Sequence, residues 1–71
     1  MKVRVIARHK GKVIETTVMS IEALIDRLID ANEVAKCMGI REQLADYNKT
    51  SVVRFTQRIR GRRYTMTARK E

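Results

Sequence analysis

The chain has 71 residues, a net charge of +8 and a single cysteine. This length fits one domain, residues 1–71, and a domain of this size buries only about 60% of its unfolded surface. One cysteine excludes an internal disulfide, and the apolar runs are far shorter than the roughly 20 residues of a membrane span. We therefore expect a small single domain in the cytoplasm.

The charge is divided unevenly along the chain. Residues 1–19 hold five Lys and Arg against one Glu, and residues 51–71 hold seven against one Glu. Residues 20–50 hold four Lys and Arg against six Asp and Glu. Two basic ends around a mildly acidic middle favour a surface that binds an anion.

The first basic segment predicts a β-hairpin. Lys2–Arg8 and Val13–Met19 are rich in β-branched residues and flank a turn at Lys10-Gly11, with a three- or four-residue loop as the alternative. A two-residue turn places three pairs on one apolar face: Val3 with Val18, Val5 with Thr16, and Ala7 with Ile14.

The middle of the chain predicts two helices. Ser20 is the expected N-cap of the first helix, whose apolar stripe repeats at helical spacing: Ile21, Leu24, Ile25, Leu28 and Ile29. Glu22, Asp26 and Asp30 occupy its opposite, solvated side. After a break near Ala31-Asn32, a second helix capped by Asn32 is expected to turn five residues inward: Val34, Ala35, Met38, Leu44 and Tyr47. Gly39 marks a kink or a turn in this helix.

The second basic segment predicts another hairpin. Val52–Ile59 and Arg63–Arg69 flank a turn at Arg60-Gly61. The predicted apolar face pairs Val53 with Ala68, Phe55 with Met66, and Gln57 with Tyr64. The two hairpins align at an offset of fifty residues, since Val3, Arg4, Arg8, Gly11 and Thr17 match Val53, Arg54, Arg58, Gly61 and Thr67. This predicts either a duplicated, pseudo-twofold pair of hairpins or convergence of two basic hairpins.

The opposite face of the second hairpin carries the candidate site. Its predicted residues are Arg54, Thr56, Arg58, Arg63, Thr65, Thr67 and Arg69, with Arg60 and Arg62 at the tip. The first hairpin adds Arg4, Arg8, Lys10 and Lys12. Arg58 lies opposite Arg63 in this register, and like charges at such a pair destabilise a sheet unless an anion binds between them. Arginine offers a planar fork suited to phosphate, so we expect a nucleic-acid-binding face.

Duplex DNA is the expected ligand. A single-strand binder places aromatic rings on its binding face, whereas Phe55 and Tyr64 fall on the predicted apolar side. A two-stranded ribbon fits the major groove, and a basic tip also fits a minor groove. Four residues are expected to supply most of the affinity through phosphate: Arg58, Arg60, Arg62 and Arg63. Arg54, Thr56 and Thr65 are the candidates for base contact.

A second interpretation comes from residues 33–40. The small Ala35 four residues before Gly39, with apolar Val34, Met38 and Ile40, resembles the first helix and turn of a helix-turn-helix. The resemblance covers about 40 residues and implies a winged fold, with Arg41–Asn48 as recognition helix and the second hairpin as wing. The chain departs from the pattern at Ala45, where a larger apolar residue usually packs, and at Glu42, an acid near the expected DNA.

No catalytic or metal site is expected. Cys37 and His9 are the only nucleophile and base of a cysteine-histidine type, and no third residue accompanies them. The chain also lacks His, Cys, Asp and Glu residues at the spacing typical of metal ligands. We therefore predict a protein that is not an enzyme and takes no cofactor.

The combined prediction is an α+β fold in the order ββααββ. Two hairpins form an antiparallel sheet, two helices cover its apolar face, and nine strand residues enter the core: Val3, Val5, Ile14, Val18, Val53, Phe55, Ile59, Tyr64 and Met66. Open sheet edges in so small a chain favour a homodimer. The predicted role is regulatory or architectural binding of duplex DNA. The alternative is a small effector or inhibitor, of the kind phages and plasmids carry, whose basic face binds an acidic protein surface.

Overall fold

The computed structural model describes residues 1–45 and 52–71. The elements follow in chain order: β1 (Lys2–His9), β2 (Lys12–Ser20), α1 (Ile21–Asp30), a 3₁₀ helix η1 (Val34–Cys37), α2 (Ile40–Leu44), β3 (Val53–Ile59) and β4 (Arg62–Lys70). The predicted α+β fold with two hairpins around a helical middle is confirmed. Tyr47 and the end of the proposed recognition helix lie outside the described residues.

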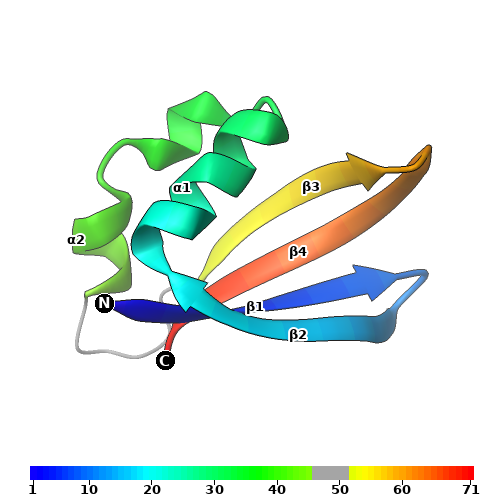
Figure 1. Ribbon diagram of the computed structural model, residues 1–71, viewed down its shortest axis with the longest axis horizontal. Helices are drawn as coiled ribbons and strands as arrows, with labels where there is room; N and C mark the ends of the chain where they lie inside the picture. The colour runs from blue at the N-terminus through cyan, green and yellow to red at the C-terminus, as the bar shows by residue number, and fades with distance from the viewer. Residues whose placement is uncertain (46–51) are drawn as a thin grey trace.

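The four strands form one antiparallel sheet in the order β2-β1-β4-β3. The helices lie on one face of this sheet and cover the half nearest the chain termini, while both hairpin tips extend beyond them (Figure 1). We call the helix-covered face the inner face and the opposite one the outer face. The outer face carries no helix of the described chain.

The second hairpin, β3–β4, has the predicted register. Val53 pairs with Ala68, Phe55 with Met66, Gln57 with Tyr64, and Arg58 with Arg63. Its turn residues Arg60 and Gly61 have φ of 52° and 80°, and Lys10 and Gly11 of the first hairpin have nearly the same angles. Positive φ at both central residues defines the type I′ turn, whose twist matches that of paired strands. Both two-residue turns are therefore confirmed.

The first hairpin, β1–β2, departs from its predicted register through a β-bulge. Pairing starts as expected beside the turn, but it shifts by one residue between Ala7 and Arg8. Beyond the bulge the actual pairs are Val3 with Met19, Val5 with Thr17, and Ala7 with Glu15. The predicted pairs of Val3 with Val18, Val5 with Thr16, and Ala7 with Ile14 are therefore wrong, because one extra residue in β2 reverses the faces that follow it.

The bulge changes which β2 residues enter the core. Met19 packs against the core in the place predicted for Val18, and Val18 is exposed on the outer face. Ile14 is also exposed. Ile59 is exposed for another reason, since it is the last residue of β3 before the turn, and the hairpin tips extend beyond the helices (Figure 1). The prediction that Val18, Ile14 and Ile59 enter the core is therefore wrong.

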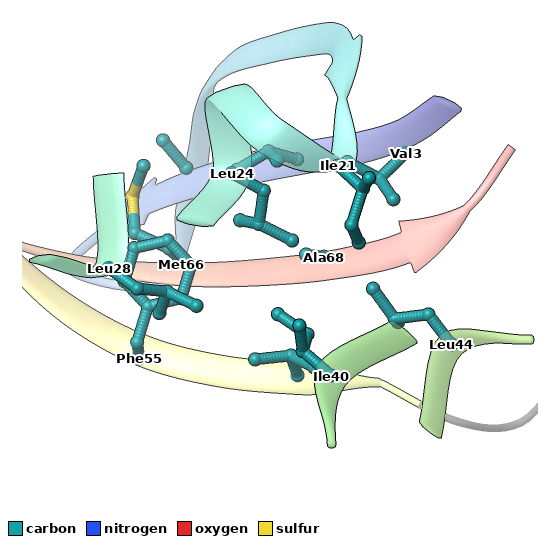
Figure 2. Close-up of a cluster of buried hydrophobic side chains, with 12 residues drawn as sticks. Val3, Ile21, Leu24, Leu28, Ile40, Leu44, Phe55, Met66 and Ala68 are labelled. Atoms are coloured by element: carbon teal, nitrogen blue, oxygen red, sulfur yellow. The ribbon is translucent and has the colours of Figure 1, made fainter. Parts of the chain in front are cut away.

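Helix α1 supplies the cover of the sheet. The Ser20 hydroxyl oxygen accepts a hydrogen bond from the Ala23 N–H at 3.1 Å, which confirms the N-cap. Ile21, Leu24 and Leu28 point from this helix onto the sheet, and Ile40 and Leu44 reach the same core from α2 (Figure 2). Twelve hydrophobic residues form the buried cluster: Val3, Val5, Ala7, Ile21, Leu24, Leu28, Ile40, Leu44, Val53, Phe55, Met66 and Ala68. Of the predicted stripe, Ile25 is partly buried and Ile29 is exposed.

The predicted second helix from Asn32 is wrong, because two left-handed residues divide the segment. Asn32 has φ of 60° and Gly39 has φ of 69°, so only the four-residue η1 and the five-residue α2 form between and after them. Val34, Ala35 and Met38 are exposed rather than inward, and Met38 is 84% exposed. Gly39 makes a true turn, as one of its two predicted alternatives.

The helix-turn-helix interpretation fails with that helix. Its first helix would occupy 33–40, where the chain forms η1 and a turn, and Ile40 and Leu44 direct α2 into the core. The Arg41 guanidinium lies 3.8 Å from a Glu22 carboxylate oxygen on α1. The second hairpin is half of the central sheet and not a wing.

The pseudo-twofold arrangement of the hairpins is also wrong. A twofold would place equivalent strands side by side, β1 with β3 or β2 with β4. In the sheet, β1 pairs with β4, so the first strand of one hairpin contacts the second strand of the other. The hairpins are related by a shift across the sheet.

Candidate nucleic-acid interface

The pairing of β1 with β4 joins the two basic segments into one surface. Arg4 pairs with Arg69, Ile6 with Thr67, and Arg8 with Thr65. Since partners in a sheet share a face, the alternating residues of all strands meet on the outer face. Its six arginines and three of its threonines come from the predicted site: Arg4, Arg8, Arg54, Arg58, Arg63, Arg69, Thr56, Thr65 and Thr67.

Two of these arginines are held by neighbours within the sheet. Arg4 Nη2 lies 3.0 Å from Glu71 Oε1, in an ion pair that stays largely exposed. Arg8 Nη1 donates a hydrogen bond of 3.0 Å to Thr67 Oγ1, which is part-buried. Glu71 is not among the site residues predicted from the sequence, although it follows Arg69 by two residues and so falls on the same face.

The other four arginines lack such a partner. Within residues 1–45 and 52–71, no carboxylate forms an ion pair with Arg54, Arg58, Arg63 or Arg69. Arg58 and Arg63 are direct cross-strand partners, as predicted. The outer face therefore carries an excess of positive charge that the described chain does not neutralise.

The four tip residues divide between two places. Lys10 and Arg60 occupy the first positions of the two turns. Lys12 pairs with His9 and Arg62 pairs with Ile59, so their register places both on the inner face, beyond the helices. The structure thus does not bring Lys12 and Arg62 together with the outer-face arginines.

His9 links the two hairpins next to their tips. Its Nδ1 lies 3.2 Å from the backbone carbonyl oxygen of Arg63, and its ring centroid is 5.4 Å from that of Tyr64. The last β1–β4 pair is Arg8 with Thr65, so this contact extends the joint by one position. It orients the backbone that carries Arg63. No local sequence pattern predicts this contact, because the pairing of the two hairpins is non-local.

The inner face leaves a shallow cavity of about 140 Å³ between α1 and the tips. Its lining is mainly apolar: Ala7, Ile14, Ile59, Tyr64 and Met66, with Glu15 and Arg27. Tyr64 therefore faces this cavity, and Phe55 is buried in the core. Neither ring is on the outer face.

The remaining candidate chemistry stays dispersed. Cys37 Sγ lies 3.9 Å from the Ile25 carbonyl oxygen, where it packs between η1 and α1, whereas His9 contacts the second hairpin. Among the described residues, no three His, Cys, Asp or Glu side chains are grouped so that they could hold a metal ion. Within residues 1–45 and 52–71, every helix is too short or too polar to cross a membrane. In comparisons with protein-family models, curated protein sequences and solved structures, no match to this chain was found.

Proposed function

We propose that this protein binds nucleic acid, with duplex DNA as the preferred ligand, through the outer face of its sheet. The observation that supports this is the gathering of six arginines on one face without a helical cover, with a single ion-paired carboxylate among the described residues. The role is regulatory or architectural, without catalysis or cofactor, and the proposed compartment is the cytoplasm.

The spacing of the cations suits a phosphate backbone. Neighbouring strands lie about 4.8 Å apart, and alternate residues of one strand lie about 6.7 Å apart, so the arginine side chains reach out on a lattice of that scale. Duplex DNA presents one negative charge per about 1.7 Å of its axis. Guanidinium groups and the Thr56 and Thr65 hydroxyls both donate hydrogen bonds to phosphate oxygens.

The width of the sheet limits how it meets a duplex. Four strands span about 14 Å between the outer two before side chains are added, which exceeds the roughly 12 Å width of the major groove. The flat part of the face, with Arg54, Thr56 and Thr65, therefore rests on phosphates. The tip of the second hairpin extends past the last β1–β4 pair as a two-stranded ribbon narrow enough for a groove. We therefore propose that Arg58, Arg60 and Arg63 contact the phosphates that line the groove, as expected from the sequence. In this arrangement the same three residues, in place of Arg54, Thr56 and Thr65, also reach the base edges.

The positions of the aromatic rings favour duplex over single strands. Single-strand binders stack bases on exposed rings. Phe55 is 2% exposed and Tyr64 faces the inner cavity, so the described outer face offers no ring for stacking. Binding through the charge of the phosphate backbone, without base stacking, fits a double helix better than a single strand.

Fluorescence anisotropy tests this proposal with labelled duplex DNA, single-stranded DNA and duplex RNA, each at about 50 and 200 mM salt. Six phosphate contacts correspond to a slope near −5 in log affinity against log salt, or a loss of about a thousandfold over this range. Steep salt dependence with tightest binding to duplex DNA is the expected result. No binding at the lower salt would overturn the proposal, and the face would then be assigned to an acidic protein surface and tested by pull-down.

A further inference from the structure

The two edges of the sheet differ in how they are protected. On β3, the Lys36 ammonium of η1 donates a hydrogen bond to the Arg54 carbonyl oxygen, and the strand itself carries Arg54 and Arg58. On β2, the stretch from Val13 to Ser20 has one charged residue, Glu15. Charges and covering segments are the usual means by which proteins stop sheet edges from pairing. The described chain provides them on β3 and almost none on β2.

β2 also exposes apolar surface. Val13 is 56% exposed, Ile14 is 54% exposed and Val18 is 44% exposed, so this strand holds three of the eight large exposed hydrophobic residues of the described chain. Val13, Thr16, Thr17 and Val18 are β-branched, which favours extended pairing. A long edge strand of this composition is a template for another strand.

We propose that β2 is a homodimer interface, in which two copies of the chain pair antiparallel through β2 and form one eight-stranded sheet. The occupant is a second copy because Val13–Ser20 carries a single charge, so two copies can pair without placing like charges opposite each other, and because antiparallel pairing about a twofold requires only one kind of edge. Burial of this edge also adds stability, because a domain of this size buries only a limited share of its surface in its own core. The dimer does not depend on the proposed binding of nucleic acid.

The β-bulge restricts the register of this pairing. Because the bulge at Ala7/Arg8 interrupts β2 near its tip, the regular segment is Glu15–Ser20. A twofold perpendicular to the sheet pairs residues of the same face, and a centre at Thr17 achieves this. Thr16 then lies opposite Val18 of the partner subunit, and Glu15 lies opposite Met19 of the partner subunit. The two Glu15 carboxylates are kept apart.

The twofold places both outer faces on the same side of the extended sheet. The outermost β3 strands would lie about 34 Å apart, or seven strand spacings, before twist is taken into account. This is close to one turn of duplex, the usual spacing of half-sites read by dimers. Only this last consequence rests on the proposed function, and it predicts a twofold-symmetric DNA site.

Sedimentation equilibrium without nucleic acid tests the interface. The matched pair of variants is Thr16→Lys on β2 and Thr56→Lys on β3, because both are exposed outer-face threonines on edge strands and both add one charge. We expect the wild type to reach twice the 8.3 kDa chain mass. Thr16→Lys should raise the dissociation constant at least tenfold, while Thr56→Lys leaves it unchanged. Circular dichroism verifies that both variants are folded.

Three results would overturn the proposal. These are a wild type that stays at the mass of one chain up to about 1 mM, equal weakening by the two variants, and weakening by Thr56→Lys alone. Hydrogen exchange gives an independent readout, since amides within Glu15–Ser20 should gain protection as protein concentration rises. Concentration-independent exchange in that segment would contradict pairing through β2 even if a dimer forms.

Discussion

The cross-strand pair of Arg58 and Arg63 should oppose folding and support binding at the same time. The two residues are direct partners in β3–β4, and no described carboxylate neutralises either one. Replacing both with glutamine keeps a polar, hydrogen-bonding side chain at each position and removes the repulsion. We therefore expect Arg58→Gln with Arg63→Gln to stabilise the free protein and to weaken its complex with duplex DNA.

The size of both effects follows from the pairing. Like charges directly opposite on a sheet cost about 0.2–1 kcal/mol, and about 0.5 kcal/mol corresponds to a rise of roughly 2–4 °C in Tm for a domain of this length. Removing either charge relieves the same repulsion, so the single variants should each give nearly the full gain. Loss of two phosphate contacts makes the salt slope shallower by about 1.8. Between 50 and 200 mM salt, the variant should therefore lose roughly tenfold less affinity than the wild type loses.

Thermal unfolding and anisotropy measure the two effects on the same variants. The control is Arg27→Gln with Arg41→Gln, which lowers the net charge equally but changes residues of the helical layer, one at the inner cavity and one beside Glu22. This control should leave the salt slope unchanged and should not raise Tm. If the Arg58 and Arg63 variants lower Tm, or if their salt slope equals that of the control, the reasoning about this pair is refuted.

Three further changes test other parts of the structure. Glu71→Gln frees Arg4 from its 3.0 Å ion pair, so affinity for duplex at low salt should rise and the slope should steepen by up to about 0.9; a weaker complex would contradict this. Arg60→Asn places a residue that tolerates positive φ at the first turn position, so urea denaturation should show a gain of about 0.5 kcal/mol while binding weakens. Leu24→Ala removes a fully buried side chain between α1 and the sheet and should lower the free energy of unfolding by about 3 kcal/mol, unlike the exposed Met38→Ala.

The second hairpin could be predicted from sequence because two independent signals agree there. The turn at Arg60-Gly61 determines the register, and that register places Val53, Phe55 and Met66 on one face and the arginines on the other. The outer-face part of the candidate site follows from this alternation alone. Arg62 was grouped with these residues by its nearness in sequence, although its parity with Tyr64 already places it on the inner face.

The first hairpin lacks that agreement. Its second strand places Val18 and Met19 next to each other, so either one can face inward with similar burial, and Thr16 and Thr17 are equally ambiguous. A bulge in such a strand exchanges one acceptable pattern for another. The structure buries Met19, and the cost is an exposed Val18. Local pattern cannot choose between these states, because the choice depends on what α1 places above the strand.

The segment after α1 misled the prediction for a related reason. Val34, Ala35 and Met38 have helical spacing, but Asn32 and Gly39 both take left-handed φ and leave too few residues for a long helix. The Glu33 N–H bonds to the Leu28 carbonyl oxygen, so the chain folds back onto the end of α1. The prediction included a break near Ala31-Asn32 and a kink or turn at Gly39, but it expected a helix to begin at Asn32, where the left-handed backbone does not allow one.

The sheet order explains how two distant basic segments become one site. Both hairpin tips lie at the same end, so antiparallel contact between the hairpins must join β1 with β4 or β2 with β3. With β1 and β4 in the centre, the chain between β2 and β3 has to cross the whole inner face, and this crossing carries α1 over the middle of the sheet. The central strands then need small or apolar inward residues, which Ala7 and Ala68 provide. The same requirement that buries these residues sets Arg4 beside Arg69 on the opposite face, so the helical cover and the basic face are two results of one topology.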